Sequence, residues 1–494
     1  MRYGDARVRG LGTSRTNPRG DYVLYWMQIA RRLERNHALD YALAEAERLG
    51  TPLVVYEGLR LDYPWASARL HRFILEGMRD NAATARLLGL NYWPWVERQR
   101  GGGRGLLARL AKRAALVVTD DFPCFIVPRQ TAALAAQTST AIALVDGNSA
   151  VPLSLLGPVV SRAADLRRRI HKAFAEAWEH RAARRPRVGR AAGRRVAPPF
   201  EPAPLDDIDR LLSRLPLGAS VAPVRETPGG TAAARRRLRR FVSRRLEGYA
   251  ESHSEPAPPD EARTSGLSPY LHFGHLSIEE VIERALASAG PWTAAAVRPD
   301  RAGHRAGFYC RDEDVNAFLD EAITWRDLGL HWHWHRAADT ATLDAALPAW
   351  ALATLGAHTT DRRPWTYPLG ALDAAQTHDP LWNAAQRELV ATGTIHNYLR
   401  MLWGKKVIEW SRTPADAYAA LVHLNNRYAL DGRDPNSWTG ILWCFGLFDR
   451  PWAPERKVLG RVRYMSSENT ARKFRLGPYL EYVSGLPAPP PSAR

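Results

Sequence analysis

Apolar and polar positions follow different patterns in the two halves of this 494-residue chain. In the first half, short apolar runs rich in Val, Leu and Tyr alternate with segments of helical periodicity. Strands that alternate with helices predict an α/β domain with a doubly wound parallel sheet. The apolar runs predict strands at 22–27, 52–59, 90–96, 115–122 and 141–147, and the other segments predict helices at 38–50 and 66–89.

From about residue 241 onward the pattern is helical throughout, which predicts an all-α domain. Before it lies a basic, Pro-rich stretch with few large apolar residues, typical of a solvent-exposed linker. The predicted organisation is a disordered basic arm at 1–20, an α/β domain at 21–165, a linker at 166–240, a helical domain at 241–484 and a disordered tail at 485–494.

The composition favours a polyanionic partner. The net charge is +18, which points first to nucleic acid, although abundant arginine from a GC-rich genome would give the same balance. Cys124, Cys310 and Cys444 stand far apart without CxxC spacing, which argues against a zinc site or a disulfide framework. With no signal peptide and no membrane-length apolar run, we expect a cytoplasmic monomer.

The segment 378–410 combines three tryptophans with many polar groups, an unusual mixture for a helix that only fills a core. His396, Arg400 and Trp403 fall on one helical face. Trp403 and Trp410 are seven residues apart, or ~10 Å along the same helix. Such closely spaced indoles suit electron transfer.

Several long motifs in the second half resemble the photolyase–cryptochrome family, and most closely its class II cyclobutane pyrimidine dimer photolyases. Shorter agreements in the first half, at 25–27, Asn36 and 117–123, extend the likeness to about residues 21–484. The motifs are TSGLSPYLHFG (264–274), HDPLWNAAQ (378–386), LRMLWGKKVIEW (399–410), LDGRDPN (430–436) and RVRYM (461–465).

The resemblance implies a Rossmann-like antenna domain followed by a helical domain that binds FAD. It implies light-driven DNA repair, in which excited reduced FAD lends an electron to a flipped-out pyrimidine dimer. A second, antenna chromophore of deazaflavin or folate type is a further expectation. The implied FAD contacts are Tyr249, Thr264, Ser265, Gly266, Leu267, Ser268, Arg326, Asn397, Arg400, Asn425, Asp431 and Asp434.

Three positions depart from the family pattern. His253 stands where relatives often read R-N-D-P, Asn397 replaces a glycine usual in class II, and Asn426 replaces an aspartate. Without the resemblance, the TSG segment would be an ordinary helix N-cap and DGRDPN an ordinary turn.

The resemblance also implies a lesion pocket. Glu321 is the dimer-binding acid, Met401 touches the dimer, and Trp443 and Trp325 form stacking walls. An acid can stabilise charge that builds on the carbonyl oxygens of the dimer. Taken alone, Met401 would be a core residue and the Glu321–Arg326 combination a surface ion pair.

In class II enzymes the positions of Trp403, Trp382 and Trp410 form the photoreduction chain, in that order. Class I enzymes use a tryptophan close before the one that matches Trp443, and Ile441 stands there instead. The resemblance therefore predicts the class II chain here.

Basic residues follow the catalytic helices and predict phosphate contacts, although isolated charge runs are more often solvated surface. They are Arg456, Lys457, Arg461 and Arg463. The sequence HWHWH at 331–335 looks like a metal-ligand cluster, since alternation would put its three histidines on one face of a strand. The segment follows a predicted helix, however, and we predict no metal site. Two other functions remain open: a cryptochrome-type receptor that binds FAD without repair, and a basic nucleic-acid-binding protein without a cofactor.

Overall fold

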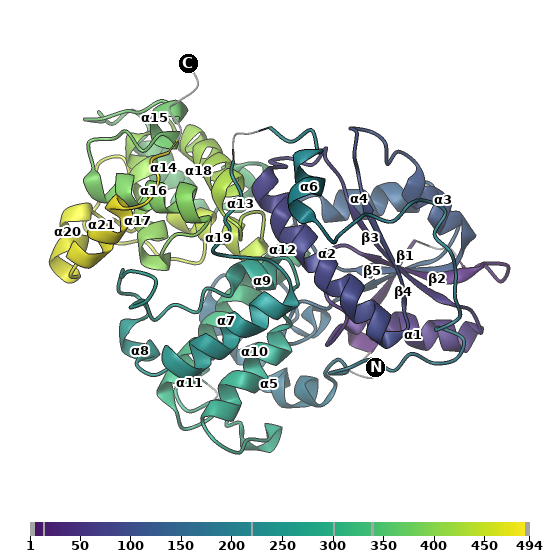
Figure 1. The fold of residues 1–494 in the computed structure, drawn as a ribbon. Coiled ribbons are helices and arrows are strands. Elements are labelled where there is room, and N and C mark those ends of the chain that lie inside the picture. Colours follow the sequence, from purple (N-terminus) through teal and green to yellow (C-terminus); the bar gives the residue numbers. More distant parts are fainter. Residues whose placement is uncertain (1–4, 13–14, 219–220, 300–301, 337–339, 490–494) are drawn as a thin grey trace.

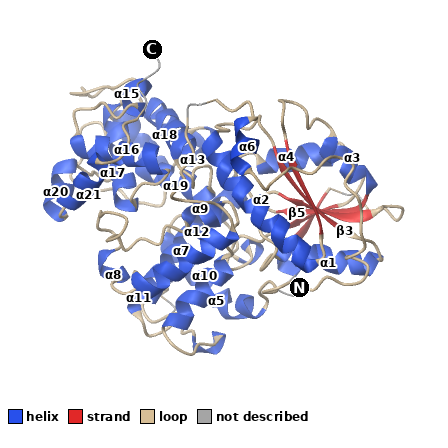
Figure 2. Cartoon of the chain, in the orientation of Figure 1, coloured by secondary structure: helices blue, strands red, loops and turns tan. Residues whose placement is uncertain are grey.

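The computed structural model describes residues 5–12, 15–218, 221–299, 302–336 and 340–489. The chain forms an α/β part and a larger helical part that lie side by side, with the long helix α2 (Ala68–Leu88) between them (Figure 1). The single sheet is confined to the α/β part, as Figure 2 shows. The predicted fold class is therefore confirmed.

The sheet has six strands in the order β1-β6-β5-β2-β3-β4, and every neighbouring pair except β1–β6 is parallel. Apolar side chains form a separate core on each face of the sheet. All five predicted strands and both predicted helices are present. The strands are β1 (Val8–Leu11), β2 (Tyr22–Met27), β3 (Leu53–Leu59), β4 (Asn91–Val96), β5 (Ala114–Asp120) and β6 (Ile142–Val145), and the helices around them are α1 (His37–Leu49), α2, α3 (Leu106–Arg113) and α4 (Val127–Ala135).

Strand β1 corrects the prediction of a disordered arm at 1–20. Val8–Leu11 pairs antiparallel with β6, and the buried Arg7 guanidinium donates to the carbonyl oxygens of Asp146, Ser149 and Ala150. The segment VRGL carries too few apolar residues to reveal an edge strand, because its side chains are only partly buried or exposed.

The predicted linker at 166–240 also needs correction. Helix α5 (Ala163–Glu179) crosses the predicted boundary and packs against the helical part, and α6 (Ile208–Ser213) and most of α7 (Thr231–Arg244) lie inside the predicted linker. The stretch between α5 and α6 is irregular but not simply exposed. Ala192 is fully buried there, and its carbonyl accepts from the Leu53 N–H at 3.0 Å.

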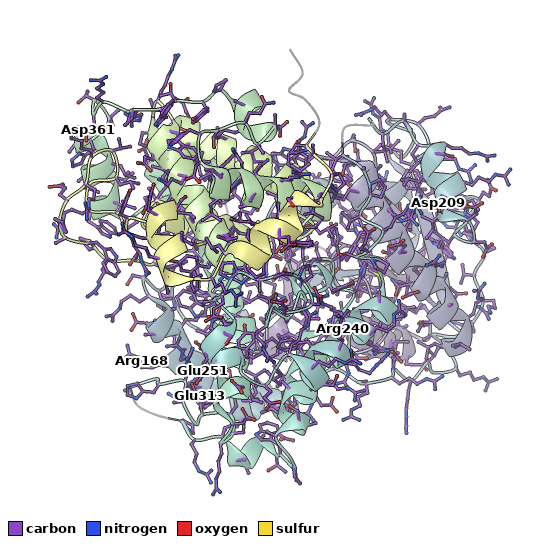
Figure 3. All side chains as sticks on the ribbon, turned by 60° about the vertical axis from the view of Figure 1, so that its left-hand side comes forward. Arg168, Asp209, Arg240, Glu251, Glu313 and Asp361 are labelled. Atoms are coloured by element: carbon purple, nitrogen blue, oxygen red, sulfur yellow. The ribbon has the colours of Figure 1, made fainter. Side chains whose placement is uncertain are left out.

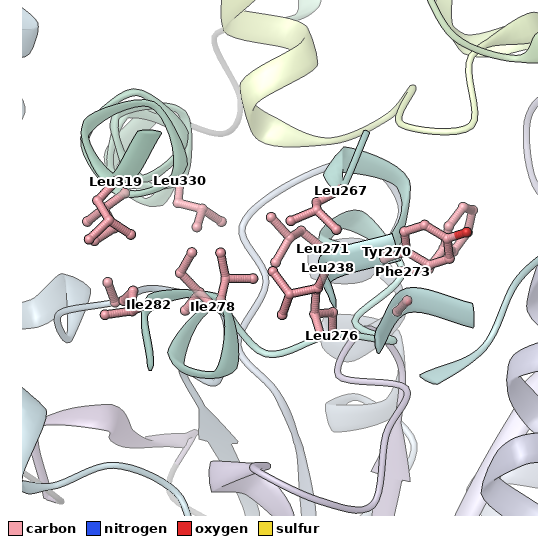
Figure 4. Close-up of a cluster of buried hydrophobic side chains, with 14 of the residues drawn as sticks. Leu238, Leu267, Tyr270, Leu271, Phe273, Leu276, Ile278, Ile282, Leu319 and Leu330 are labelled. Carbon is pink, nitrogen blue, oxygen red and sulfur yellow. The ribbon is translucent and has the colours of Figure 1, made fainter. Parts of the chain in front are cut away.

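Helices make up the rest of the chain, as predicted. Buried leucine and isoleucine side chains join α7, α9, α10 and α12 into one cluster, which Figure 4 shows. Of the predicted tail, 490–494 lies outside the described residues and 485–489 is irregular. The longer or site-forming helices are α8 (Tyr249–Ser252), α9 (Ser268–His272), α10 (Ile278–Ser288), α11 (Glu313–Leu319), α12 (Arg326–Arg336), α14 (Ala349–Ala357), α16 (Pro380–Thr392), α17 (Asn397–Trp410), α18 (Pro414–Tyr428), α19 (Pro435–Cys444), α20 (Ser467–Lys473) and α21 (Gly477–Ser484).

Candidate active site

Helices α17 and α19 approach each other closely and bring two predicted lesion contacts together. Gly404 makes the approach possible, because a Cβ atom there would lie 2.5 Å from the Cys444 sulfur. Met401 and Trp443, one from each helix, are both partly buried and pack against the same apolar core. Their remaining exposed surface is available to a ligand.

Paired polar groups flank this helix pair. The Arg400 guanidinium on α17 donates to the Asp431 carboxylate at 3.0 Å, and His272 lies 3.1 Å from Asp434. Burial alone would raise the pKa of Asp434, but the hydrogen bond with His272 and the nearby Arg326 charge outweigh it, so this pKa lies below its ordinary value. The buried Asn425 amide donates to the Ser437 hydroxyl at 2.9 Å and to Asn426 at 3.0 Å.

The loop formed by Thr264, Ser265, Gly266 and Leu267 leads into the short helix α9, which Ser268 begins. Gly266 has φ +64°, and a Cβ atom there would strike the Arg237 guanidinium. Arg237 donates to the Ser265 carbonyl oxygen at 2.8 Å. The positive charge beside this loop therefore comes from a side chain of α7 that the motif analysis did not identify.

The remaining predicted cofactor contacts are more widely spread. Tyr249 is buried, and its ring stacks on the His253 ring at 4.6 Å. Arg326 is buried and donates to the Asn148 carbonyl oxygen at 2.7 Å and to Asp327 at 3.1 Å, which ties it to the α/β part. Asn397 is exposed at the start of α17.

Glu321 and Trp325 lie on a π-helix, Asp320–Trp325, inserted between α11 and α12. A spacing of four residues would place these two side chains on one face of an α-helix, and the wider π turn changes that relation. Glu321 is partly buried, and burial together with the charge of Asp320 raises its pKa to about 7. Its carboxyl group can therefore carry a proton near neutral pH.

The three predicted electron-transfer tryptophans are buried and in ring contact. The Trp403 and Trp382 rings are stacked with centroids 6.3 Å apart, and Trp382 meets Trp410 edge-on at 5.6 Å. Trp403 N–H donates to the Gln386 side chain at 3.0 Å, which fixes the first ring. Beyond Trp410, the Tyr367 ring follows at 5.4 Å.

Several known photolyases are similar to this chain in sequence, and a photolyase and a cryptochrome are similar to it in fold. The chain is 34% identical over 492 residues to a deoxyribodipyrimidine photo-lyase of Methanothermobacter thermautotrophicus, covering 97% of this chain and 98% of that protein. Deoxyribodipyrimidine photo-lyase of Oryza sativa subsp. japonica is 31% identical over 506 residues, covering 97% of this chain and 91% of that protein. The chain belongs to the deoxyribodipyrimidine photo-lyase family. No protein-family model matches it.

Two solved structures agree with this photolyase fold. A class III photolyase from Agrobacterium tumefaciens superposes with a TM-score of 0.68 at 17% identity, covering 94% of this chain and 86% of that one. A Synechocystis cryptochrome superposes with a TM-score of 0.66 at 15% identity, covering 93% and 88%. At these identities the two structures support the fold alone.

The photolyase fold here carries an exposed basic loop beside Trp443. The Arg463 guanidinium lies over the Trp443 ring at 5.7 Å and over the Trp452 ring at 4.9 Å. Arg456, Lys457 and Arg461 are also exposed, and Arg456 lies over the Tyr464 ring at 5.5 Å. Arg463 thus borders the predicted stacking wall.

The HWHWH segment lies inside α12, where each of its histidines lies within hydrogen-bond distance of a backbone carbonyl oxygen. His331 and His335 each lie 2.9 Å from the Gly157 carbonyl oxygen, and His333 lies 2.9 Å from that of Gly329. Within the described ranges, no group of three or more His, Cys, Asp or Glu side chains could hold a metal ion. Nor does any described helix have the length and apolarity to cross a membrane.

A cavity of about 470 Å³ lies at the carboxyl ends of β2 and β3. Such ends of parallel strands commonly bind ligands. None of the residues predicted to bind FAD lines it, but His272, which pairs with Asp434, does. Aromatic rings and arginines line it together, including Tyr56, Tyr63, Trp95, Phe125, Arg31 and Arg60.

Proposed function

We propose that this protein is a class II photolyase that repairs ultraviolet-induced cyclobutane pyrimidine dimers in DNA with light. The observation that carries the proposal is the pair Met401 and Trp443, partly exposed on neighbouring helices and bordered by Arg463. An aromatic ring with a cation close to it suits a flipped-out base and its phosphate. Base flipping is an established step for photolyases as a class, and the proposal adopts it from the family.

Reduced FAD is the proposed cofactor, and the donor set fits it. Arg237 beside the Gly266 loop offers positive charge to a pyrophosphate, while Asn425 and the Arg400–Asp431 pair offer neutral and charged partners to a flavin ring. When bound and illuminated, reduced FAD supplies the electron that opens the cyclobutane ring. Tyr249, Asn397, Arg326 and Asp434 are proposed as further contacts.

The protein residues orient the dimer and manage protons and electrons. Trp443, with Trp325, forms the wall on which the extruded pyrimidines stack. Protonated Glu321 donates a hydrogen bond to a dimer carbonyl, and this bond strengthens as negative charge builds there. Trp410, Trp382 and Trp403 relay electrons toward the cofactor when it is oxidised.

The cavity beside β2 and β3 is the proposed site of a second chromophore, of deazaflavin or folate type. Both types are planar, which suits the Tyr56, Trp95 and Phe125 rings, and both carry acidic groups, which suit Arg31 and Arg60. Light absorbed there would reach FAD in the helical part.

Binding in the dark distinguishes repair from a cryptochrome-type receptor. The purified, FAD-loaded protein is titrated with one duplex that contains a single dimer and with the same duplex without it. A repair enzyme binds the dimer duplex more tightly, and Trp443→Ala reduces that preference about tenfold while FAD is retained. Equal affinity of the unmodified protein for both duplexes would favour the receptor function.

A further inference from the structure

Lys405 is a buried cation to which the proposed repair mechanism assigns no role. Its side chain is fully buried on α17, one turn after Met401 and on the same helical face. Its ammonium donates to the Cys444 carbonyl oxygen at 2.7 Å and lies 4.8 Å from the centre of the Trp443 ring. A buried lysine destabilises the folded state unless its charge is paired or hydrogen-bonded.

Both contacts act on the orientation of Trp443. Cys444 is the last residue of α19, so its carbonyl is one of the free acceptors at the negative end of that helix. The ammonium therefore fixes the end of α19 through a hydrogen bond and the indole through a cation–π contact. Arg463 approaches the same indole but is exposed, so Lys405 provides the buried support.

We propose that Lys405 is a positioning residue for the lesion, holding Trp443 in the orientation on which a flipped-out pyrimidine stacks. The inference rests on the proposed repair function. It assigns Lys405 no contact with the reacting atoms; the residue acts through Trp443.

The protonation of Lys405 gives the inference a distinctive signature. Burial lowers its pKa to about 8, against the attraction of nearby Asp449 and with added repulsion from Arg463. The neighbouring Cys444 thiol does not titrate there, since burial raises its pKa to about 11. The cation–π contact is therefore present below about pH 8 and lost above it.

The effect on folding has the opposite sign. Because the pKa of this lysine is lower in the folded state than in the unfolded state, the unfolded chain binds more protons between the two values. From Lys405 alone, the free energy of unfolding rises as the pH passes above about 8, while lesion binding weakens. A lysine with a merely structural role would not weaken lesion binding while the fold gains stability.

The test measures the ratio of dark affinities for dimer-containing and undamaged duplex, because phosphate contacts largely cancel in that ratio. Lys405→Met is expected to lower the ratio about tenfold, with FAD retained. The matched control is Lys406→Met on the same helix, because Lys406 pairs with Glu409 at 3.0 Å and lies over Trp410 instead. This control is expected to keep the ratio of the unmodified protein.

A second measurement follows the pH dependence of this ratio, which the unmodified protein alone already tests. In the unmodified protein the ratio is expected to fall as the pH rises through about 8. Lys405→Met is expected to lose this step and to keep only a change near pH 7, where Glu321 loses its proton. A pH-independent ratio, or a Lys405→Met protein with the original ratio, would overturn the inference and leave the repair proposal intact. If the unmodified protein shows no dimer preference at any pH, both are wrong.

Discussion

Burial sets the protonation of the key side chains at the residue scale. Glu321 has a pKa of about 7 where an exposed glutamate would be ionised, because its partly buried position disfavours the charged form. A carboxyl group that keeps its proton near neutral pH can donate a hydrogen bond. This property matches the proposed role at the dimer carbonyl.

The pH dependence of repair tests that role. In chemically reduced protein saturated with dimer DNA, the quantum yield of splitting is expected to fall as the pH rises through about 7, because Glu321 loses its proton. Glu321→Gln keeps an N–H donor and is expected to remove this dependence, whereas Glu321→Ala lowers the yield throughout. A Glu321→Ala protein with the original yield would show that the carboxyl group has another function.

Only part of the site could be predicted residue by residue. The resemblance implied roles for Glu321, Met401 and Trp443, and Met401 lies inside one of the long matching motifs, at 399–410. The sequence did not single out Arg237 or Lys405. Arg237 is one of several arginines in α7 and Lys405 is one of two adjacent lysines, and the neighbouring residues do not reveal what either side chain contacts. Their importance depends on which neighbour each side chain reaches in the folded chain.

Two features at the element scale determine how the site is built. The helical pattern of the second half continues through 315–330, yet a π-helix interrupts the α-helical turns there at Asp320–Trp325. Apolar periodicity cannot reveal one extra residue in a turn, and such turns are frequent at functional sites. By contrast, the spacing of Trp403 and Trp410 predicted that they share one helix, and the resemblance implied that Trp382 lies beside them, as the structure has it.

The contact between Trp403 and Trp382 is the basis of the photoreduction prediction. Trp403→Phe is expected to nearly abolish light-driven reduction of bound oxidised FAD, followed by flavin absorbance, because the first ring of the relay is lost. The same variant, once reduced chemically, is expected to repair dimers normally. Trp365→Phe is a suitable control, since this exposed ring contacts His378 and not the relay itself. Undiminished photoreduction in Trp403→Phe would mean that electrons enter by another route.

At the scale of the whole molecule, the contact between the α/β and helical parts holds the structure together. Arg69 on α2 is buried and its guanidinium donates to the carbonyl oxygens of Ala222, Tyr428 and Val390 at 2.9, 2.7 and 2.6 Å. One side chain therefore joins segments that are far apart in the sequence. Figure 3 shows side chains filling the space between the elements, with Asp209 and Asp361 at the periphery.

Replacing this arginine tests the contact. Arg69→Met keeps the apolar stem but removes the donor to the buried carbonyl groups of Tyr428 and Val390, so the free energy of unfolding is expected to fall by about 3 kcal/mol or more. Arg48→Met, which removes an exposed pair with Glu45, is expected to change it little. Urea unfolding measures both, and a similar small effect in the two variants would show that Arg69 does not hold the parts together.

Domain boundaries were the least predictable feature at this scale. The central strands are long apolar runs and were visible in the sequence, whereas the edge strand β1 and the first residues of α5 were not. The basic composition of the predicted linker suggested exposure, but backbone contacts such as that of Ala192 with Leu53 attach part of it to the sheet. The hydropathy pattern reflects side chains and therefore cannot predict backbone hydrogen bonds of this kind.

Light-driven repair is the most direct test of the central claim. Chemically reduced, FAD-loaded protein is mixed with an oligonucleotide that contains one thymine dimer, and the recovery of thymine absorbance is followed under blue light and in the dark. The proposed function predicts recovery over many turnovers in the light, none in the dark, and no net oxidation of the flavin. Absence of recovery in the light, with FAD bound and reduced, would contradict the assignment of this protein as a repair enzyme.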